Sequence, residues 1–200
     1  MNFYSEEHEL VRNTARKFAE KHLKPGVIER DENAEFPSEQ VIMMGELGFM
    51  GVMVPERWNG AGMDTISYTL IIEELSRVDA SAGVIVSVNN SLVCQIFVNY
   101  GNDWQKETYL TKLASGEQLG AFSLSEPQSG SDASNIHTVA EKNGPYYVLN
   151  GTKNWVTNGI NSDVVIVMAL TDKSVGHNGI SAFIVPKDLD GFSVGKKEDK

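Results

Sequence analysis

The sequence predicts an α+β fold in which an amino-terminal all-α helical bundle precedes an incomplete antiparallel β-barrel. Up to residue 117, apolar residues recur at the spacing that is typical of helices. From residue 118 onward the pattern changes to short runs rich in β-branched and aromatic residues, separated by Asn-Gly pairs. Because helices precede strands rather than alternate with them, we place a helical domain at residues 1–117 and a β domain at residues 118–200.

The first predicted helix begins after Ser5 and ends before Pro25-Gly26. Serine is a preferred N-cap, two glutamates follow it, and a Pro-Gly pair interrupts a helix. The apolar stripe of this helix consists of Leu10, Val11, Phe18, Ala19 and Leu23. We therefore expect one face of the helix to be buried.

Further helices are predicted before residue 118. They cover Ser38–Leu47, a segment from Asp64 or Thr65 to Val78, the segment Gly83–Tyr100, and a last helix from an Asp103 cap to Gly116. The connection Gly48–Gly62 is rich in glycine and is expected to be irregular. The segment Gly83–Tyr100 is apolar on nearly every side, which is typical of a helix at the centre of a bundle.

Strands are predicted at Leu119–Leu124, Tyr146–Leu149, Asn154–Thr157, Val164–Leu170 and Ile180–Val185. Turns are expected at Asn150-Gly151, Asn158-Gly159 and Asn178-Gly179, because Asn-Gly readily adopts the positive φ angles of tight hairpins. The sequence then stops in the polar run Gly195–Lys200, directly after a strand. We therefore expect the β domain to be truncated.

The composition argues against several classes of function. The chain has 27 acidic and 17 basic residues and a net charge of −10, the wrong sign for binding nucleic acid or an anionic membrane by neutralising phosphates. The amino terminus shows no signal or transit peptide pattern, and the apolar stretches fall short of the ~20 residues of a membrane span. We expect a cytoplasmic bacterial protein; the alternative is a processed protein of the mitochondrial matrix.

Neither the cysteine nor the histidines indicate a reactive or metal-binding site. Cys94 lies in an apolar run without a nearby Lys, Arg or His to stabilise a thiolate, so we predict a small core residue. The histidines, which are His8, His22, His137 and His177, lack the spacing of metal ligands. We predict no metal site.

One candidate site is the segment Ala121–Asp132, where a predicted strand runs into a loop dense in hydroxyl groups and backbone amides. Such a loop can hydrogen-bond the carbonyls of a flat heterocycle at the strand end and a phosphate at the turn Ser129-Gly130-Ser131. The alternative is a capped turn without a ligand, because Ser, Pro, Gly and Asp favour turns in any protein.

A second candidate is Gly151–Gly159, which we interpret as a strand between two Asn-Gly turns. Trp155 and Thr157 are two residues apart and would share a face of that strand. A large ring beside a hydroxyl can stack on an aromatic cofactor and hydrogen-bond it. The alternative is a core tryptophan with a hydroxyl at the end of the sheet.

Together the two segments resemble the acyl-CoA dehydrogenase family. The loop Leu124-Ser125-Glu126-Pro127-x-x-Gly130-Ser131-Asp132 is similar to the family's flavin signature, and Lys153-x-Trp155-Val156-Thr157-Asn158 is similar to its second flavin-contacting strand. The similarity extends in order over essentially the whole chain, through Glu46–Phe49, Pro55-Glu56, Glu73–Ser76 and Gly101–Asp103. Two motifs at the right separation are far more specific than either motif alone.

The resemblance implies FAD as the cofactor. The residues that would bind it are Phe122, Leu124, Ser125, Gly130, Ser131, Trp155, Val156 and Thr157. The Ser125 hydroxyl and the backbone of Phe122 and Leu124 would meet the pyrimidine side of the ring. Trp155 would lie beside the isoalloxazine with Thr157 near its reactive N5 edge, and Val156 would supply a backbone contact.

Ser131 matches the serine that contacts the pantetheine-pyrophosphate arm of the CoA thioester, which makes it the implied substrate-binding residue. The chain departs from the family at three positions of the loop. Ser125 stands where the family more often has Thr, and either hydroxyl can donate. Gln128 and Ser129 stand where small residues are common, which leaves the acyl preference open.

The reaction that the resemblance implies removes a proton from Cα and a hydride from Cβ of an acyl-CoA, giving a trans-2-enoyl-CoA in fatty acid β-oxidation. Electrons would pass to an electron-transfer flavoprotein, and the full-length enzyme would be a homotetramer. The general pattern, with Asn89–Leu92, resembles short-chain or butyryl-type enzymes.

The family's catalytic base is a glutamate of a carboxy-terminal helical domain, which we expect beyond Lys200, so no catalytic residue is assigned within this chain. Glu126 is expected to be a structural hydrogen-bonding residue, and Glu73 and Glu74 to cap a helix or face solvent. Two alternatives remain open. One is an acyl-CoA oxidase or flavin monooxygenase of the same superfamily, and the other is a non-catalytic relative or fragment that only binds.

Overall fold

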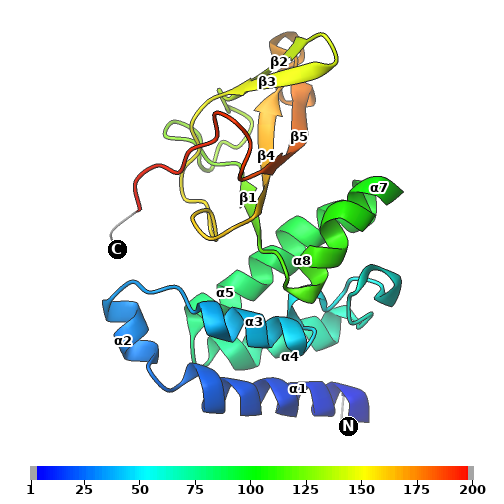
Figure 1. Cartoon of the computed structure of the whole chain (residues 1–200), viewed down its shortest axis with the longest axis vertical. Helices are drawn as coiled ribbons and strands as arrows, with labels where there is room; N and C mark the ends of the chain where they lie inside the picture. The colour runs from blue at the N-terminus through cyan, green and yellow to red at the C-terminus, as the bar shows by residue number, and fades with distance from the viewer. Residues whose placement is uncertain (1–3, 198–200) are drawn as a thin grey trace. The chain divides into compact units, whose positions relative to one another are not determined.

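The computed structural model describes residues 4–197, and the chain divides between Leu119 and Gly120 into two compact units, each of which is described by itself. The first unit is built of helices and the second around a β-sheet (Figure 1). The predicted order of a helical unit followed by a β unit is confirmed.

The first unit contains α1 (Glu6–Phe18), α2 (Val27–Glu32), α3 (Ser38–Glu46), α4 (Thr65–Ser76), α5 (Ala80–Ser87), α6 (Gln95–Tyr100), α7 (Asp103–Gln105) and α8 (Thr111–Ser115). The π-helical segments Ala19–Leu23, Val88–Cys94 and Lys106–Leu110 continue the helices before them. The irregular connection after α3 contains the 3₁₀ turns Phe49–Gly51 and Glu56–Trp58. The buried face of α1 packs into a core that includes Phe18, Leu23, Met44, Phe49, Ile71, Leu75 and Val86.

The predicted helix starts are confirmed at Ser5, Ser38 and Asp64, whereas the helix predicted from Gly83 begins at Ala80. The side chains of Ser5 and Asp64 each accept a hydrogen bond from the backbone N–H of the third helical residue. The last helix is capped by Asn102 rather than by Asp103, because the Asn102 side chain accepts a hydrogen bond from the backbone N–H of Gln105. Helix α2 was not predicted, since it buries no residue and so shows no apolar stripe.

The segments α5, Val88–Cys94 and α6 form one helix from Ala80 to Tyr100. By length and composition this helix could cross a membrane, so the expectation that no apolar stretch is long enough is wrong. Half of that stretch is buried inside the protein, as in the central helix of a bundle. Cys94 on this helix is fully buried, and burial raises the pKa of its thiol to about 12, which confirms it as a core residue.

Two adjacent buried asparagines of this helix hold the irregular connection that follows α3. The Asn90 side chain accepts a hydrogen bond from Val52 N at 2.8 Å and donates to Phe49 O at 2.8 Å. The Asn89 side chain donates to Met50 O at 2.8 Å. The connection lacks the regular bonds of a long helix or a sheet, so these side chains satisfy backbone groups that burial would otherwise penalise.

Glu74 corrects the expectation that both glutamates of α4 cap a helix or face solvent. Its side chain is only 2% exposed and accepts hydrogen bonds from Arg12 at 3.0 Å and from Arg16 at 2.5 Å, both on α1. Hydrogen bonds from Arg16, opposed by burial and supported by Arg12, hold the pKa of Glu74 at about 2. Glu73 is exposed as expected and lies 3.9 Å from Arg12.

The second unit contains β1 (Gly120–Ser123), β2 (Val139–Asn143), β3 (Tyr146–Asn150), β4 (Val164–Leu170) and β5 (Ile180–Pro186). Strand β4 is central, because it pairs with β1 and β5 and meets the start of β2 at its last residue, while β3 pairs with β2. The described sheet is not closed into a barrel. Its core contains Ala121, Val165, Val167 and Val185, against which Leu149, Val156 and Phe183 pack.

Two features of the sheet differ from the prediction. Strands β1 and β4 pair in parallel, whereas β4–β5 is antiparallel as expected and β2–β3 is an antiparallel pair that was not predicted. The long connection between β1 and β4 allows the second strand to return in the same direction. Strand β2 was missed because its polar end lacks strand-forming residues, and its hairpin to β3 turns at Gly144-Pro145, with Gly144 at φ 60°.

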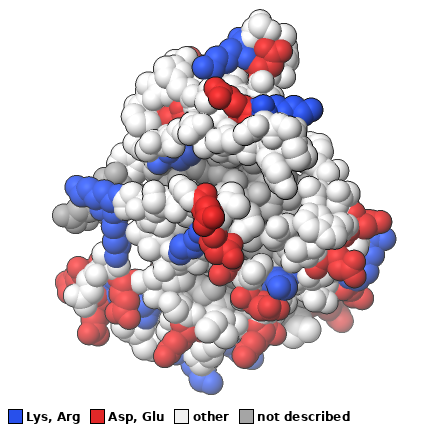
Figure 2. Space-filling model, turned by 45° about the horizontal axis from the view of Figure 1, so that its top comes forward, with Lys and Arg blue, Asp and Glu red and all other residues white. Residues whose placement is uncertain are grey.

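Figure 2 shows charged side chains of both signs on one face of the protein. On the face drawn in Figure 2, basic side chains lie among acidic ones rather than in one basic patch.

Replacing Glu74 with Gln is expected to lower the free energy of unfolding by about 1–3 kcal/mol, because the guanidinium groups of Arg12, Arg16 and Arg77 lose a buried charged partner. Urea unfolding followed by far-ultraviolet circular dichroism measures the change. Glu73→Gln is the matched control, and we expect a change within about 0.5 kcal/mol because surface pairs contribute little. Equal losses in the two variants would contradict the role assigned to Glu74.

Candidate functional site

The exit of strand β1 is shaped by a tight turn. After Ser123 the chain continues through Leu124 and Ser125 and then folds back between Glu126 and Ser129. Glu126 N donates to Ser129 O at 2.8 Å, and Ser129 N donates to Glu126 O at 3.0 Å. Pro127 inside the turn fixes its own φ angle, which stiffens the corner. The turn directs the following residues, Gly130 and Ser131, to the surface.

Glu126 is a buried carboxylate, and its structural role is confirmed. It accepts hydrogen bonds from Lys153 Nζ at 2.8 Å, Gln128 Nε2 at 2.6 Å, and the backbone N–H groups of His137 and Thr138. Burial raises the pKa of Glu126, but the hydrogen bonds from Lys153, Thr138 and His137 outweigh it and hold the pKa at about 2. A carboxylate saturated in this way is a very weak base.

The second candidate segment is not a strand, which corrects the prediction for Asn154–Thr157. Its backbone is held instead by bonds to the exit of β1. Lys153 Nζ donates to Leu124 O at 2.9 Å, and Asn154 N donates to Ser125 O at 2.9 Å. The structure therefore brings the two motifs together, although not through the sheet pairing that alternating residue types suggested.

Trp155 follows directly and has an unusual backbone conformation. Its φ angle is 58°, a left-handed conformation that is a genuine outlier for a bulky residue, and its side chain is 64% exposed. The expectation that Trp155 and Thr157 share a strand face is therefore wrong. Beyond them Asn158 also has a positive φ of 67°, and its buried side chain donates to Gly120 O at 3.1 Å. The segment is thus anchored on both sides of the exposed indole.

The predicted site residues differ in exposure. Phe122, Leu124, Ser125, Val156 and Thr157 are half-buried, whereas Gly130, Ser131 and Trp155 are exposed. Val156 packs against the sheet core. Within residues 4–197 no hydrogen bond or ring contact joins Ser131 to the Trp155–Thr157 segment, so the described contacts unite the strand exit with Lys153 and Asn154 but do not include Ser131.

The hydroxyls of Ser125, Ser131 and Thr157 make no hydrogen bond within the described part of the chain. Other hydroxyls of the same unit are engaged: those of Ser129, Ser134 and Ser162 donate to Asp132 O, Asp132 Oδ1 and Gly159 O. The buried hydroxyl of Thr138 also lacks a hydrogen-bond partner among residues 4–197, so this property is not confined to the three hydroxyls that the sequence selected.

Sequence reasoning missed Lys153 and Asn154, to which it assigned no role. Lys153 lies within the quoted motif, two residues before Trp155, and a lysine inside a predicted strand was the signal that could have found it.

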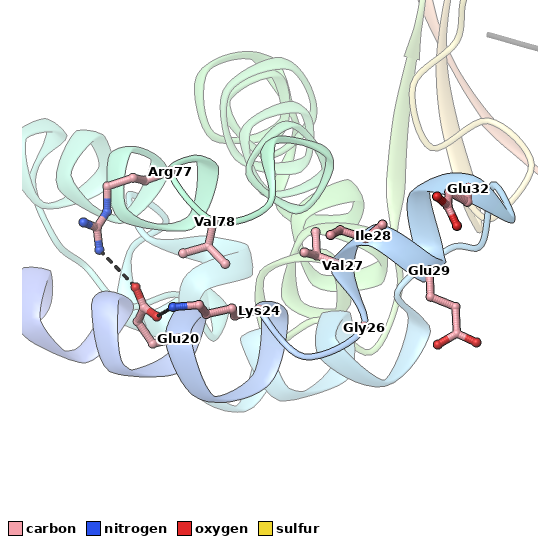
Figure 3. Close-up of a pocket in the computed structure, with 9 residues that line it drawn as sticks. All are labelled: Glu20, Lys24, Gly26, Val27, Ile28, Glu29, Glu32, Arg77 and Val78. Carbon is pink, nitrogen blue, oxygen red and sulfur yellow. Dashed lines mark hydrogen bonds and ion pairs between the residues drawn. The ribbon is translucent and has the colours of Figure 1, made fainter.

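A cavity in the helical unit is a weaker candidate. Its volume is about 680 Å³, and it is lined by Glu20, Lys24, Gly26, Val27, Ile28, Glu29, Glu32, Arg77 and Val78 (Figure 3). Its central charges pair with one another, since Glu20 contacts Lys24 at 2.7 Å and Arg77 at 3.4 Å. No predicted site residue lines it. Among residues 4–197, no group of three or more His, Cys, Asp or Glu side chains could hold a metal ion.

Two family models match the chain. Residues 5–117 match the model described as acyl-CoA dehydrogenase, N-terminal domain, and residues 121–200 match the model described as acyl-CoA dehydrogenase, middle domain. The short-chain specific acyl-CoA dehydrogenase of Rattus norvegicus mitochondria is 46% identical over 98% of this chain and 47% of its own length. An acyl-CoA dehydrogenase of Bacillus subtilis is 46% identical over 98% of this chain and 52% of its own length.

Solved structures show the same similarity. Butyryl-CoA dehydrogenase from Megasphaera elsdenii matches with a TM-score of 0.96 and 40% identity over 100% of this chain and 54% of that chain. A chain from work on the electron transferring flavoprotein of Acidaminococcus fermentans matches with a TM-score of 0.97 and 44% identity over 100% of this chain and 53% of that chain. An acyl-CoA dehydrogenase complexed with FAD from Bacillus anthracis matches with a TM-score of 0.88 and 36% identity over 99% of this chain and 34% of that chain. The chain spans about half the length of the curated relatives it matches.

Acid is expected to remove the stabilisation that Glu126 provides. The folded-state pKa of about 2 lies below the value of about 4.3 for an unfolded glutamate, so the folded state binds fewer protons between these values. The stabilisation is then complete above about pH 5 and is lost as the pH falls toward 2. Denaturation of the wild type and of Glu126→Gln over this range should show the stability difference shrinking; a constant difference would contradict the assignment.

Proposed function

The chain belongs to the acyl-CoA dehydrogenase family, and on that premise we propose that it forms the flavin-facing part of an FAD-dependent enzyme that converts an acyl-CoA thioester to the trans-2-enoyl-CoA. Residues 1–117 are assigned to the helical domain and residues 118–200 to the middle β domain. Relatives that match the chain are acyl-CoA dehydrogenases, which are oxidoreductases acting on CH–CH groups.

The observation that carries the proposal is the exposed, strained Trp155 beside a strand exit whose hydroxyls are uncommitted. Holding a bulky residue at a positive φ costs about 1–3 kcal/mol, and an exposed indole gains little burial in return. Such strain persists where the surrounding structure imposes it, and it clusters at ligand-binding positions. A flat aromatic cofactor would cover the exposed indole and bury part of its surface.

The residues present fit FAD. Trp155 would contact the face or edge of the ring, and the Ser125 and Thr157 hydroxyls would hydrogen-bond its polar edges. The backbone of Phe122, Leu124 and Val156 would line the same side. When bound, FAD supplies the chemistry of hydride acceptance.

The loop beyond the turn would take the CoA portion of the substrate. Ser131 is exposed with a free hydroxyl, and Gly130 has no atom within 4 Å of the position of a Cβ, so both could approach a phosphate or amide closely. This assignment makes Ser131 the substrate-binding residue, and both Gly130 and Ser131 remain proposed contacts of FAD.

The catalytic base is not assigned within residues 4–197. Removing the weakly acidic α-proton needs a carboxylate of adequate basicity. Glu126 and Glu74 are both saturated by donors, and both have a pKa of about 2. The proposal that the base is a glutamate outside residues 1–200 rests on the resemblance to the family.

A short acyl chain and an electron-transferring flavoprotein are the proposed substrate class and electron acceptor. The supporting observations are the names of the relatives, which include short-chain specific and butyryl-CoA dehydrogenases, and the Acidaminococcus fermentans match. A homotetramer is proposed for the complete protein on the family resemblance. The bacterial relatives favour a cytoplasmic location.

Trp155→Ala in the complete encoded protein is expected to weaken FAD affinity about tenfold, because the ring loses its aromatic contact. Titration of the apoprotein with FAD, followed by flavin fluorescence, measures the affinity. Trp104→Ala is the matched control, since Trp104 is 66% exposed but lies on a helix of the first unit. If both variants bound FAD as the wild type does, the assignment of Trp155 would be rejected.

Butyryl-CoA added without oxygen is expected to bleach the visible absorbance of the FAD-loaded complete protein. Reoxidation should be fast with an electron-transferring flavoprotein and slow with oxygen alone, measured by stopped flow. Fast turnover with oxygen would instead support the acyl-CoA oxidase or monooxygenase alternative. Bound FAD that no acyl-CoA reduces would support a non-catalytic relative.

A further inference from the structure

We propose that Lys153 and Glu126 are positioning residues, which fix the orientation of Trp155 and hold its segment against the exit of strand β1. The inference rests on the proposed function, because the two residues affect the reaction only if Trp155 and Ser125 face FAD. Neither residue is assigned a direct contact with cofactor or substrate.

Lys153 joins two segments that no sheet ladder connects. Its ammonium group is 2.9 Å from Leu124 O and 2.8 Å from Glu126 Oε1, and both ends of the ion pair are buried, at 9% and 2% side-chain exposure. Glu126 in turn accepts from the backbone N–H groups of His137 and Thr138. One cation and one carboxylate thereby connect three stretches of irregular backbone.

The contacts converge on the residues just before Trp155. Asn154 N donates to Ser125 O at 2.9 Å. A Cβ at Gly151 would come within 2.3 Å of Thr138 Oγ1, so this end of the segment lies directly on Thr138. Since Trp155 follows these fixed points at a φ of 58°, the direction of its side chain is set by the segment before it.

A structural role alone explains the pair poorly. Burying an ion pair is costly, and a well-packed apolar pair of similar volume is often equally stable. Apolar side chains, however, could not supply the directed bonds to Leu124 O and to the two backbone N–H groups. Without those bonds the segment has no ladder to hold it, and Trp155 would relax from its strained conformation.

The helical unit supplies a matched control. Arg30 likewise contacts a buried carboxylate, Asp79, at 3.2 Å and donates to the backbone oxygens of Pro25 and Leu23. Replacing Arg30 with Met therefore removes a cation with the same kinds of partner as Lys153. Arg30 has no assigned contact with a ligand.

The first experiment measures the near-ultraviolet circular dichroism of Trp155 in the absence of cofactor. The chain has three tryptophans, so Trp58→Phe and Trp104→Phe leave Trp155 as the sole reporter. In this background Lys153→Met is expected to change the near-ultraviolet circular dichroism of Trp155, Lys153→Arg to retain most of the signal, and Arg30→Met to leave it unchanged. An unchanged signal in a folded Lys153→Met variant would overturn the inference. Glu126→Gln, which keeps an acceptor but loses the charge, is the second variant and should change the signal in the same direction.

The second experiment uses the complete encoded protein loaded with FAD. Lys153→Met is expected to weaken FAD affinity about tenfold and to alter the visible flavin spectrum, whereas Lys153→Arg should remain within about threefold of the wild type. Arg30→Met should lose stability without either change. If the wild type bound no FAD, the proposed function would fail while the tryptophan signal still tested the positioning role. Wild-type affinity and spectrum in Lys153→Met would refute the inference itself.

Discussion

The buried carboxylate of Glu126 is the constraint on which the candidate site depends. The chain leaves strand β1, turns, forms a hairpin and returns at Lys153 without any sheet pairing between the outgoing and returning segments. Irregular backbone of this kind leaves N–H and C=O groups that must find partners when they are buried. Glu126 and Lys153 supply several of these partners at one point, with bonds to Leu124, His137 and Thr138. A polar cluster therefore takes the place of a strand.

Two of the buried carboxylates, Glu126 and Glu74, show what sequence reasoning can and cannot predict. Glu126 was expected to be structural because the proline after it and its place in a loop predict a hydrogen-bonding role, and the structure confirms this. Glu74 was expected at the surface, since a glutamate on a helix usually faces solvent. Its partners, Arg12 and Arg16, are far away in the sequence and four residues apart on α1, so they meet Glu74 only once α1 packs on α4. Local signals predict local bonds, whereas ion pairs between elements depend on packing.

The same distinction explains the rest of the fold. Helix starts at Ser5 and Asp64 follow from capping chemistry within one turn and were predictable. Residues 154–157 were predicted as a strand because their side chains favour strands and Asn-Gly pairs flank them. The left-handed conformation at Trp155 could not be predicted, because no residue type there favours it. Lys153, two residues before Trp155, is held by contacts to Leu124 and Glu126, which lie more than 25 positions earlier in the chain.

The hydroxyl groups of the β unit suggest how the site is divided between folding and binding. Some hydroxyls donate hydrogen bonds to nearby oxygens and so stabilise the turns; these are Ser129, Ser134 and Ser162. The hydroxyls of Ser125, at the exit of β1, and of Thr157 are on half-buried residues, yet make no such bond within residues 4–197. A half-buried hydroxyl without a protein partner is satisfied by water or by a ligand, and a ligand that supplies acceptors gains from donors already in place. Lys153 and Glu126 fix the backbone before a ligand arrives, so binding would cost little conformational entropy. A pre-formed polar cluster has this advantage over a flexible loop as the base of a binding site.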